Sequence, residues 1–303
     1  MSSDHTVSGP RAYTPLTEQD RRARAAESGG EPVLDFSIGR VNENSTPYID
    51  YHSVDTLLSL QHPRTDEPAE LTFYIVGQVQ ELLFKLMFTE VNRVRDLLFE
   101  DDLTEAMRFL RRVASVERTL TACWEPVSTL TPAEFLGFRD ALGAASGFQS
   151  YMYRQLEFSL GNKDPRMAEA YHAVPWLHEQ VSEVLRAPSL YDAALSVLHR
   201  RGLIPRKCLN ERYAEPYEPD VLVEDAWAAV YGSPRQHHEL YVFAEALADL
   251  NYHYSRWRTT HLLAVERIMG YKPGTGGTLG VEWLRRVAEH RFFPELWSVR
   301  TRL

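Results

Sequence analysis

The sequence predicts an all-α protein, and three observations support this fold class. Apolar residues recur at three- or four-residue steps over long stretches, as expected for amphipathic helices. The alternation of apolar and polar residues that marks strands is almost absent, and helix-capping patterns separate the stretches. The chain has 303 residues, 44% of them hydrophobic and 25% charged, which suits one large soluble domain or two small ones.

The N-terminal part is predicted as an arm followed by a helical domain. Residues 1–44 are mostly small, polar or charged, and we expect a mobile arm there, with the folded domain at 45–303. A short amphipathic helix is expected after Pro47 and is closed by Pro63. Two longer helical patterns cover about 70–99 and 102–126, and the second is expected to end before Pro126.

The clearest helix start is Thr131-Pro132-Ala133-Glu134, a capping box with proline at the first helical position. This helix is expected to reach about residue 142, where glycines interrupt the pattern. Further helices are predicted at roughly 148–160, 166–186 and 190–201, with an irregular stretch at 205–219. We interpret 165–235 as a small helical insertion in a bundle that surrounds a site.

Charge and cysteine content limit the class of protein. The formal net charge of −9 argues against nucleic acid or an anionic membrane as the main partner. Cys123 and Cys208 lie far apart and form no CxxC pair, so neither a zinc site nor a disulfide framework is indicated. No apolar run that approaches a transmembrane span and no signal peptide in Met1–Arg11 is recognised, so we expect a cytoplasmic protein.

One helical pattern carries a histidine on its apolar side. His261 lies in a stripe at three- or four-residue steps that contains Leu247, Leu250, Tyr254, Trp257, Val265 and Ile268. Gly270 is expected to end this helix in the αL conformation. The histidine could hold a prosthetic group, or it could be a core histidine that bonds to a backbone carbonyl. Spacing alone favours the second interpretation.

A glycine-rich loop at 274–280 follows the histidine helix. It is not a nucleotide motif, because Lys272 precedes the glycines where a P-loop lysine would follow them. We interpret it as a mobile lid in which Thr275 supplies a hydroxyl when the lid closes. Upstream, Ser146-Gly147-Phe148-Gln149-Ser150 interrupts a helical pattern, where backbone donors and hydroxyls could meet a polar ligand or merely turn a corner.

Two pairs one helical turn apart are candidates for a binding site. Phe73 and Gly77 share a helix face, where the bare glycine could admit a flat ligand or allow close helix packing, and packing is the simpler explanation. Phe135 and Arg139 share another face. The neighbours of Arg139 are apolar, so its guanidinium needs an anionic partner such as a substrate carboxylate, unless it is a surface charge.

Several blocks of the chain resemble the tryptophan 2,3-dioxygenase family of haem enzymes. The resemblance covers roughly residues 45–303, in order and at matching spacings. The blocks are Tyr48-Ile49-Asp50-Tyr51 and Leu58 to Pro63; Phe73, Gln78 and Glu81 to Lys85; Phe138-Arg139, Ser146 to Ser150, Arg154 and Glu157; Trp257-Arg258, His261, Val265 to Arg267, Gly270, Lys272 and Gly274 to Gly277; and Phe293 to Trp297 with Arg300-Thr301.

The resemblance implies roles for individual residues. His261 matches the proximal ligand of a b-type haem iron, and the haem pocket is implied to include Trp124, Ser146 and Gly147. Arg139 matches the residue that pairs with the substrate carboxylate, and Thr275 matches the contact to the substrate ammonium and carboxylate. Phe73 matches a wall of the indole pocket. Tyr48 and Tyr51 match tyrosines that reach a neighbouring subunit, which implies a homotetramer with exchanged N-terminal segments.

The sequence departs from the family at three of these positions. The family's distal histidine falls on Gly77, a tyrosine near the arginine falls on Phe135, and a leucine of the N-terminal segment falls on His52. His52 could return an imidazole from the neighbouring chain, or it could be a surface histidine. Losing the distal imidazole removes one hydrogen bond to the indole N–H and opens space above the iron.

The resemblance implies an enzyme that uses O2 and haem on the indole ring of L-tryptophan or a substituted tryptophan. The expected product is of the N-formylkynurenine type, from a dioxygenase. One alternative is a monooxygenase of specialised metabolism that gives a 2-oxindole or hydroxylates tyrosine. A further alternative is a non-catalytic haem sensor.

Overall fold

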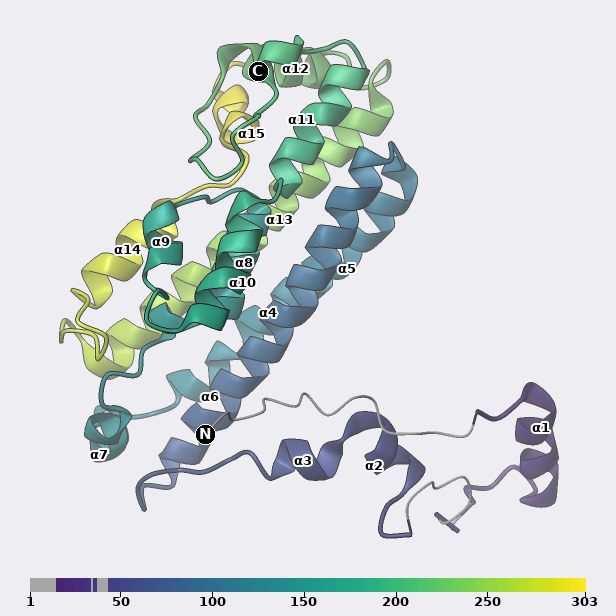
Figure 1. Cartoon of the computed structure of the whole chain (residues 1–303), viewed down its shortest axis with the longest axis vertical. Helices are drawn as coiled ribbons and strands as arrows, with labels where there is room; N and C mark the ends of the chain where they lie inside the picture. The colour runs from purple at the N-terminus through teal and green to yellow at the C-terminus, as the bar shows by residue number, and fades with distance from the viewer. Residues whose placement is uncertain (1–14, 34, 37–42) are drawn as a thin grey trace. The chain divides into compact units, whose positions relative to one another are not determined.

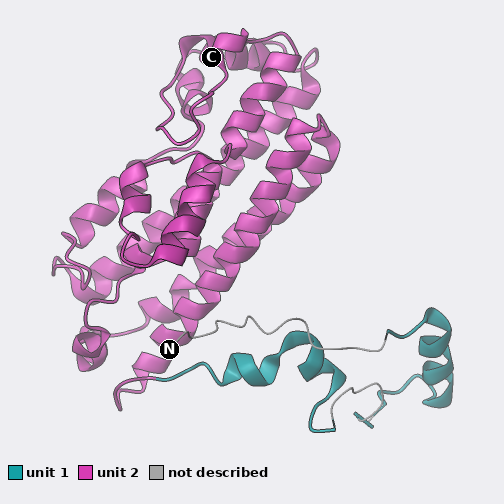
Figure 2. Ribbon diagram, viewed as in Figure 1, with its two compact units in different colours: residues 1–62 teal, residues 63–303 magenta. Residues whose placement is uncertain are grey.

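The computed structural model describes residues 15–33, 35–36 and 43–303, and these form two compact units at 1–62 and 63–303 (Figure 2). The described residues contain helices and no strand, so the predicted all-α fold class is confirmed. The signal-peptide prediction for Met1–Arg11 lies outside the described residues. The first unit contains α1 (Glu18–Glu27), α2 (Pro47–His52) and α3 (Val54–Leu58).

The second unit is a helical bundle (Figure 1). Its helices are α4 (Ala69–Phe99), α5 (Leu103–Ala122), α6 (Trp124–Ser128), α7 (Pro132–Arg139), α8 (Tyr151–Leu160), α9 (Pro165–Glu169), α10 (Pro175–Arg186), α11 (Leu190–Arg200), α12 (Val221–Gly232), α13 (His238–Met269), α14 (Val281–Glu289) and α15 (Pro294–Ser298). Short 3₁₀ turns are η1 (Asp140–Leu142), η2 (Gly147–Gln149), η3 (Arg206–Cys208) and η4 (Val299–Thr301).

The two longest helices organise this bundle. Helix α4 packs against α5, α8 and α11, and α13 packs against α5, α6, α7 and α14. The main core lies where α4, α5, α11 and α13 meet, and fully buried members include Met87, Val113 and Leu247. A smaller core joins α6, α7 and α13 beside the first turns of α4.

Several predicted details of the helices differ from the structure. The segment predicted as a helix at 166–186 forms two helices, α9 and α10, and α7 ends at Arg139, with the 3₁₀ turn η1 continuing to Leu142. The helix after Pro47 is divided at Ser53, which adopts αL with φ of 52°. The 102–126 pattern ends at Ala122, and Pro126 lies within the separate helix α6. Proline is tolerated there because amide groups in the first helical turn have no intrahelical acceptor. Gly270 ends α13 with positive φ, but its ψ of −142° lies outside αL, in a region that only glycine adopts easily.

Helix α4 is long and apolar enough, by length and composition alone, to cross a membrane, whereas the sequence had indicated no such span. This is weak support for a span, because core helices of soluble proteins pass the same test. The helix also carries Glu81, Lys85 and Glu90, and it packs against five other helices, α5, α6, α7, α8 and α11. We therefore describe it as a bundle helix with one exposed apolar side.

Candidate functional site

The imidazole of His261 lies flat against an indole ring. Trp124 stacks on it with ring centroids 4.3 Å apart and the planes inclined by 4°, and Trp257 lies 5.9 Å away. Within the described residues, no hydrogen bond holds the ring of His261, so the structure gives no support to the alternative of a carbonyl-bonded core histidine. Burial lowers the pKa of His261 to about 4. The imidazole is therefore neutral at neutral pH, which is the form that ligates metals.

Buried indole N–H groups next to this histidine lack acceptors. Nε1 of Trp124 and Nε1 of Trp257 are both buried, and each has no hydrogen-bond partner in the described part of the chain. A buried unpaired donor costs about 1–3 kcal/mol, so such a pair indicates an acceptor that the protein itself does not supply. Stacked aromatic rings, a neutral imidazole and unpaired donors together suit a planar prosthetic group with polar edges, as haem is.

Three phenylalanines form an aromatic cluster in the smaller core. Phe73 of α4 lies 6.1 Å from Phe135 and 5.5 Å from Phe138, both on α7, measured between ring centroids. Phe135 and Phe138 are buried. Thr131 and Glu134 form the predicted capping box that starts α7, so this prediction is confirmed. The cluster gives the site a flat apolar wall that suits an aromatic ligand.

The helix face beside Phe73 is open at Gly77. A Cβ atom built at Gly77 would have no other heavy atom within 4 Å beyond its own helix backbone and its chain neighbours. Close packing of helices therefore does not explain this glycine within the described chain. The glycine leaves room next to the aromatic wall, on the same side of α4 as Phe73.

Arg139 joins the aromatic wall to the glycine-rich loop. Its Nη2 donates a hydrogen bond to the Pro273 carbonyl at 2.8 Å. Its Nε–H is buried and has no acceptor among the described residues. One edge of the guanidinium is thus held by the protein, while another donor still lacks a partner. A carboxylate is the partner that best fits such an edge.

The glycine-rich loop is closed over the turn that begins α8. Thr275 Oγ1 donates to the Ala145 carbonyl at 2.6 Å. A Cβ atom on Gly276 would lie 2.7 Å from Ser146 Cβ, so only glycine permits this approach. The structure thus brings Arg139, Thr275 and Ser146 together, although they are far apart in sequence.

The turn itself is a second capping box. Ser146 Oγ accepts a hydrogen bond from Phe148 N at 3.3 Å, and Gln149 Oε1 accepts one from Ser146 N at 3.3 Å. Gly147 begins the 3₁₀ turn, and Ser150 then caps α8 through Tyr153 N. The predicted interruption of the helix is confirmed, and its hydroxyls also serve to start these turns.

The N-terminal candidates form their own aromatic group on α2. The rings of Tyr48 and Tyr51 each lie 4.8 Å from the ring of His52. Both tyrosines are highly exposed, at 65% and 80%. These three residues belong to the first unit.

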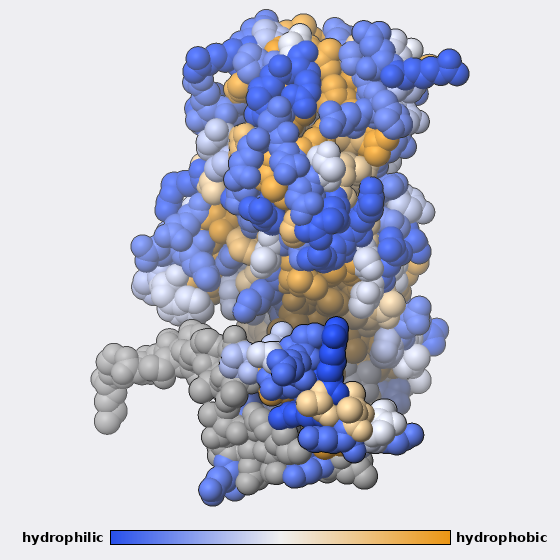
Figure 3. All heavy atoms as spheres, turned by 90° about the vertical axis from the view of Figure 1, so that its right-hand side faces the viewer, coloured by the Kyte–Doolittle hydropathy of each residue, from blue (hydrophilic) through white to orange (hydrophobic). Residues whose placement is uncertain are grey.

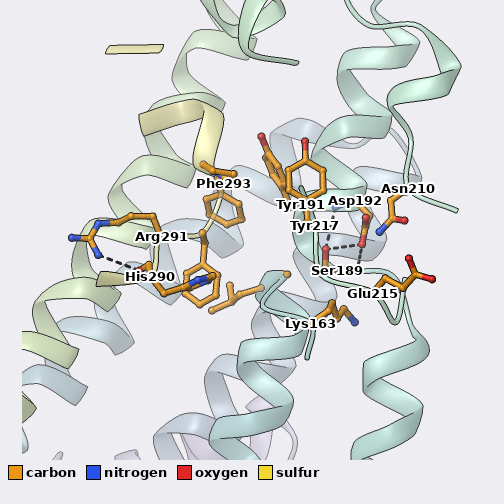
Figure 4. Close-up of a pocket in the computed structure, with 14 residues that line it drawn as sticks. Lys163, Ser189, Tyr191, Asp192, Asn210, Glu215, Tyr217, His290, Arg291 and Phe293 are labelled. Carbon is orange, nitrogen blue, oxygen red and sulfur yellow. Dashed lines mark hydrogen bonds between the residues drawn. The ribbon is translucent and has the colours of Figure 1, made fainter. Parts of the chain in front are cut away.

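Sequence reasoning assigned no role to a buried ion network between α8 and α13. Glu157 receives hydrogen bonds from Arg154 and Arg258, and all three side chains are buried. The sequence pattern that could have indicated this network is the pair of charged residues Arg154 and Glu157, which lie three positions apart in the otherwise largely apolar α8 segment. A small cavity of about 60 Å³ near Lys163 and His290 contains none of the predicted site residues (Figure 4).

The fold and site are those of an all-α protein whose neutral histidine, aromatic wall and arginine suit a planar group and an anion. A family profile described as tryptophan 2,3-dioxygenase matches residues 35–202 and 221–303. The chain is 45% identical to a tryptophan 2,3-dioxygenase of Exiguobacterium sibiricum over 271 residues, covering 89% of this chain and 97% of that one.

Two other relatives carry the same name. The protein from Bacillus thuringiensis is 43% identical over 86% of this chain and 94% of its own length. The protein from Shewanella woodyi is 39% identical over 91% of this chain and 97% of its own. The chain therefore belongs to the tryptophan 2,3-dioxygenase family, whose members are haem-dependent, and it is a tryptophan 2,3-dioxygenase-like oxidoreductase. The family predicted from sequence is confirmed.

Proposed function

We propose that the domain predicted at residues 45–303 binds haem b through His261 and oxidises the indole ring of L-tryptophan or a substituted tryptophan. The observation that carries this proposal is the neutral His261 ring, which has no hydrogen bond and stacks on Trp124. The unpaired N–H of Trp124 supplies a donor for a polar edge of the haem. When bound, haem supplies the activation of O2 that the reaction needs.

The protein's own residues fix the amino-acid end of the substrate. The unpaired Nε–H of Arg139 is offered to the substrate carboxylate. Thr275 already donates its proton to Ala145, so its oxygen remains free to accept a hydrogen bond from the substrate ammonium. The lid, held by Gly276 on Ser146, then excludes water from the bound substrate.

The aromatic wall sets the position of the indole ring. Phe73, with Phe135 behind it, lies along one side, and the open face at Gly77 leaves space for a ring substituent or a different tilt. The absence of an imidazole at Gly77 leaves the indole N–H without an acceptor from α4. His52 of a neighbouring subunit is a candidate replacement, because the α2 aromatic group is exposed.

The open face at Gly77 also favours a second candidate, insertion of a single oxygen atom to give a 2-oxindole, or hydroxylation of tyrosine. Turnover under 18O2 with tryptophan, methyl-substituted tryptophans and tyrosine separates the two candidates by mass spectrometry. Two labelled atoms in a ring-opened product support the dioxygenase. One labelled atom, with dependence on an added reductant, supports the monooxygenase and refutes the dioxygenase.

A homotetramer is part of this proposal, and an apolar stripe on α4 supports self-association. The residues of the stripe follow one another at three- or four-residue steps and are exposed. Figure 3 shows further apolar residues at the surface of one face of the protein. Its members are Leu71, Ile75, Val79, Leu82 and Leu86. Exposed apolar faces of this kind are typical of interfaces. Light scattering of the purified protein should give four times 34.8 kDa, and a monomer mass would refute the tetramer.

A cytoplasmic location, with no nucleic-acid or membrane partner, completes the proposal.

A further inference from the structure

Two arginines, Arg154 of α8 and Arg258 of α13, share the buried carboxylate of Glu157 on α8. Arg258 Nη2 of α13 donates to Glu157 Oε1 of α8 at 2.5 Å, and Arg154 Nη1 donates to the other oxygen, Oε2. The exposed fractions are 6% for Arg154, 1% for Glu157 and 4% for Arg258. Arg258 Nε also donates to Tyr153 Oη at 3.3 Å. The charges are thus removed from bulk solvent and held in fixed positions.

The charges in this network do not cancel. Burial alone would raise the pKa of the Glu157 carboxyl, but the two guanidinium groups outweigh burial and hold it below its usual value, so Glu157 is anionic. Burial lowers the pKa of nearby His290 to about 4, and burial raises that of Tyr153 to about 12, so both are neutral at neutral pH. Two cations and one anion leave one surplus positive charge.

One more acid lies within electrostatic reach of Arg154. The Arg154 guanidinium helps to lower the pKa of Asp164, but the main cause is Arg166, whose side chain donates hydrogen bonds to the Asp164 carboxylate at 2.9 and 3.0 Å. Asp164 and Arg166 therefore neutralise each other at the surface. The surplus charge on the buried network is not removed by this pair.

The surplus charge lies close to the proposed haem ligand. Arg258 precedes His261 by three residues, a rise of about 4.5 Å along α13. The ring of Tyr153, which Arg258 contacts, lies 5.5 Å from Trp257, and Trp257 lies 5.9 Å from His261. Burial weakens the screening between this charge and any group that His261 holds.

We propose that the Arg154–Glu157–Arg258 network sets the reduction potential of the haem iron and favours its ferrous form. The inference rests on the proposed function, because it requires haem on His261. Ferric iron becomes ferrous by taking up one electron from a reductant, and it loses one positive charge. A fixed positive charge nearby therefore stabilises the ferrous state relative to the ferric state. Ferrous haem is the form that binds O2.

The competing explanation is that the network merely ties α8 to α13 and so orients His261. The two explanations predict different directions for the shifts of the midpoint potential in the variants. A purely structural role predicts that any disruption loosens the site and moves the potential in one direction. A charge effect predicts opposite shifts when the anion is removed and when a cation is removed.

The test is the midpoint potential of full-length, haem-loaded protein, measured by spectroelectrochemistry. Glu157→Gln leaves two buried cations, so the potential should rise. Arg154→Met leaves no surplus charge, so the potential should fall, whereas Arg154→Lys should stay near wild type. Arg256→Gln is the matched control, because it removes an exposed arginine from the same helix, where solvent screens the charge.

Shifts of Glu157→Gln and Arg154→Met in the same direction would overturn the charge proposal, as would an equal shift in Arg256→Gln. Where Glu157→Gln fails to fold, equal potentials in Arg154→Met and Arg154→Lys overturn it. Haem content of wild type and His261→Ala is measured first. If the wild type holds haem through His261 but the variants shift its midpoint potential in the wrong directions, the charge proposal is refuted and the proposed function is not.

Discussion

Replacement of Arg139 by leucine tests the proposed carboxylate contact. The guanidinium donates to the Pro273 carbonyl at 2.8 Å and keeps one buried N–H without a partner. A hydrogen bond to a charged group contributes about 1.5–3 kcal/mol. At about 1.4 kcal/mol per tenfold, one lost contact of this kind should lower kcat/KM roughly 10- to 150-fold. Loss of the second contact, to Pro273, should add to this effect by loosening the lid.

The assay is steady-state turnover of tryptophan by haem-loaded protein, with haem content measured in parallel. Arg267→Leu is the matched control, since Arg267 also donates to a backbone carbonyl, that of Ser128 at 2.7 Å, but lies exposed. We expect haem content to be unchanged in both variants and kcat/KM to fall only in Arg139→Leu. Wild-type kcat/KM in Arg139→Leu would refute the carboxylate contact.

Three further changes have defined outcomes. Gly77→His should raise the kcat/KM ratio of plain to ring-substituted tryptophan; an unchanged ratio with lower thermal stability contradicts the pocket at Gly77. Gly276→Ala places Cβ against Ser146 and should cost about 1–3 kcal/mol of lid closure, seen as a roughly 5- to 150-fold loss of kcat/KM; an unchanged value means that the lid does not close there. Burial raises the pKa of Glu117 well above 4.5. The folded protein then holds a proton that the unfolded chain releases, so the free energy of unfolding falls as pH rises above about 4.5, by up to about 1.4 kcal/mol per unit. Glu117→Gln should remove this slope in denaturant titrations, and an identical slope in the variant rules out Glu117 as its source.

Local patterns in the sequence predicted most of the helices. The stripe that contains His261 and the capping box at Thr131 both specify helices through contacts within a few residues. The break at Ser53 was missed because a left-handed non-glycine residue has no clear sequence pattern. The new helix that begins at Trp124 was not predicted, because a proline usually ends a helix. Pro126 lies in the first turn of α6, where proline is tolerated.

The site depends on contacts that are distant in sequence. The hydrogen bond between Arg139 and Pro273 spans 134 residues, and no local pattern indicates it. The stacking of Trp124 on His261 joins α6 to α13 in the same way. A one-turn spacing on α4 could not show that the space beside Gly77 is open, because that depends on where the other helices lie. The candidate residues could therefore be named from the sequence, but the fold was needed to show which of them meet.

The most direct test of the central claim is haem binding by His261→Ala. The variant is compared with wild type by absorption spectra of the ferric and ferrous forms and by haem content after gel filtration. Leu247→Ala, which removes a fully buried side chain from the same helix fourteen residues before His261, is the control for damage to α13. We predict that His261→Ala loses the Soret band of the wild type while remaining folded. Equal haem content and unchanged spectra in His261→Ala and wild type would contradict the account.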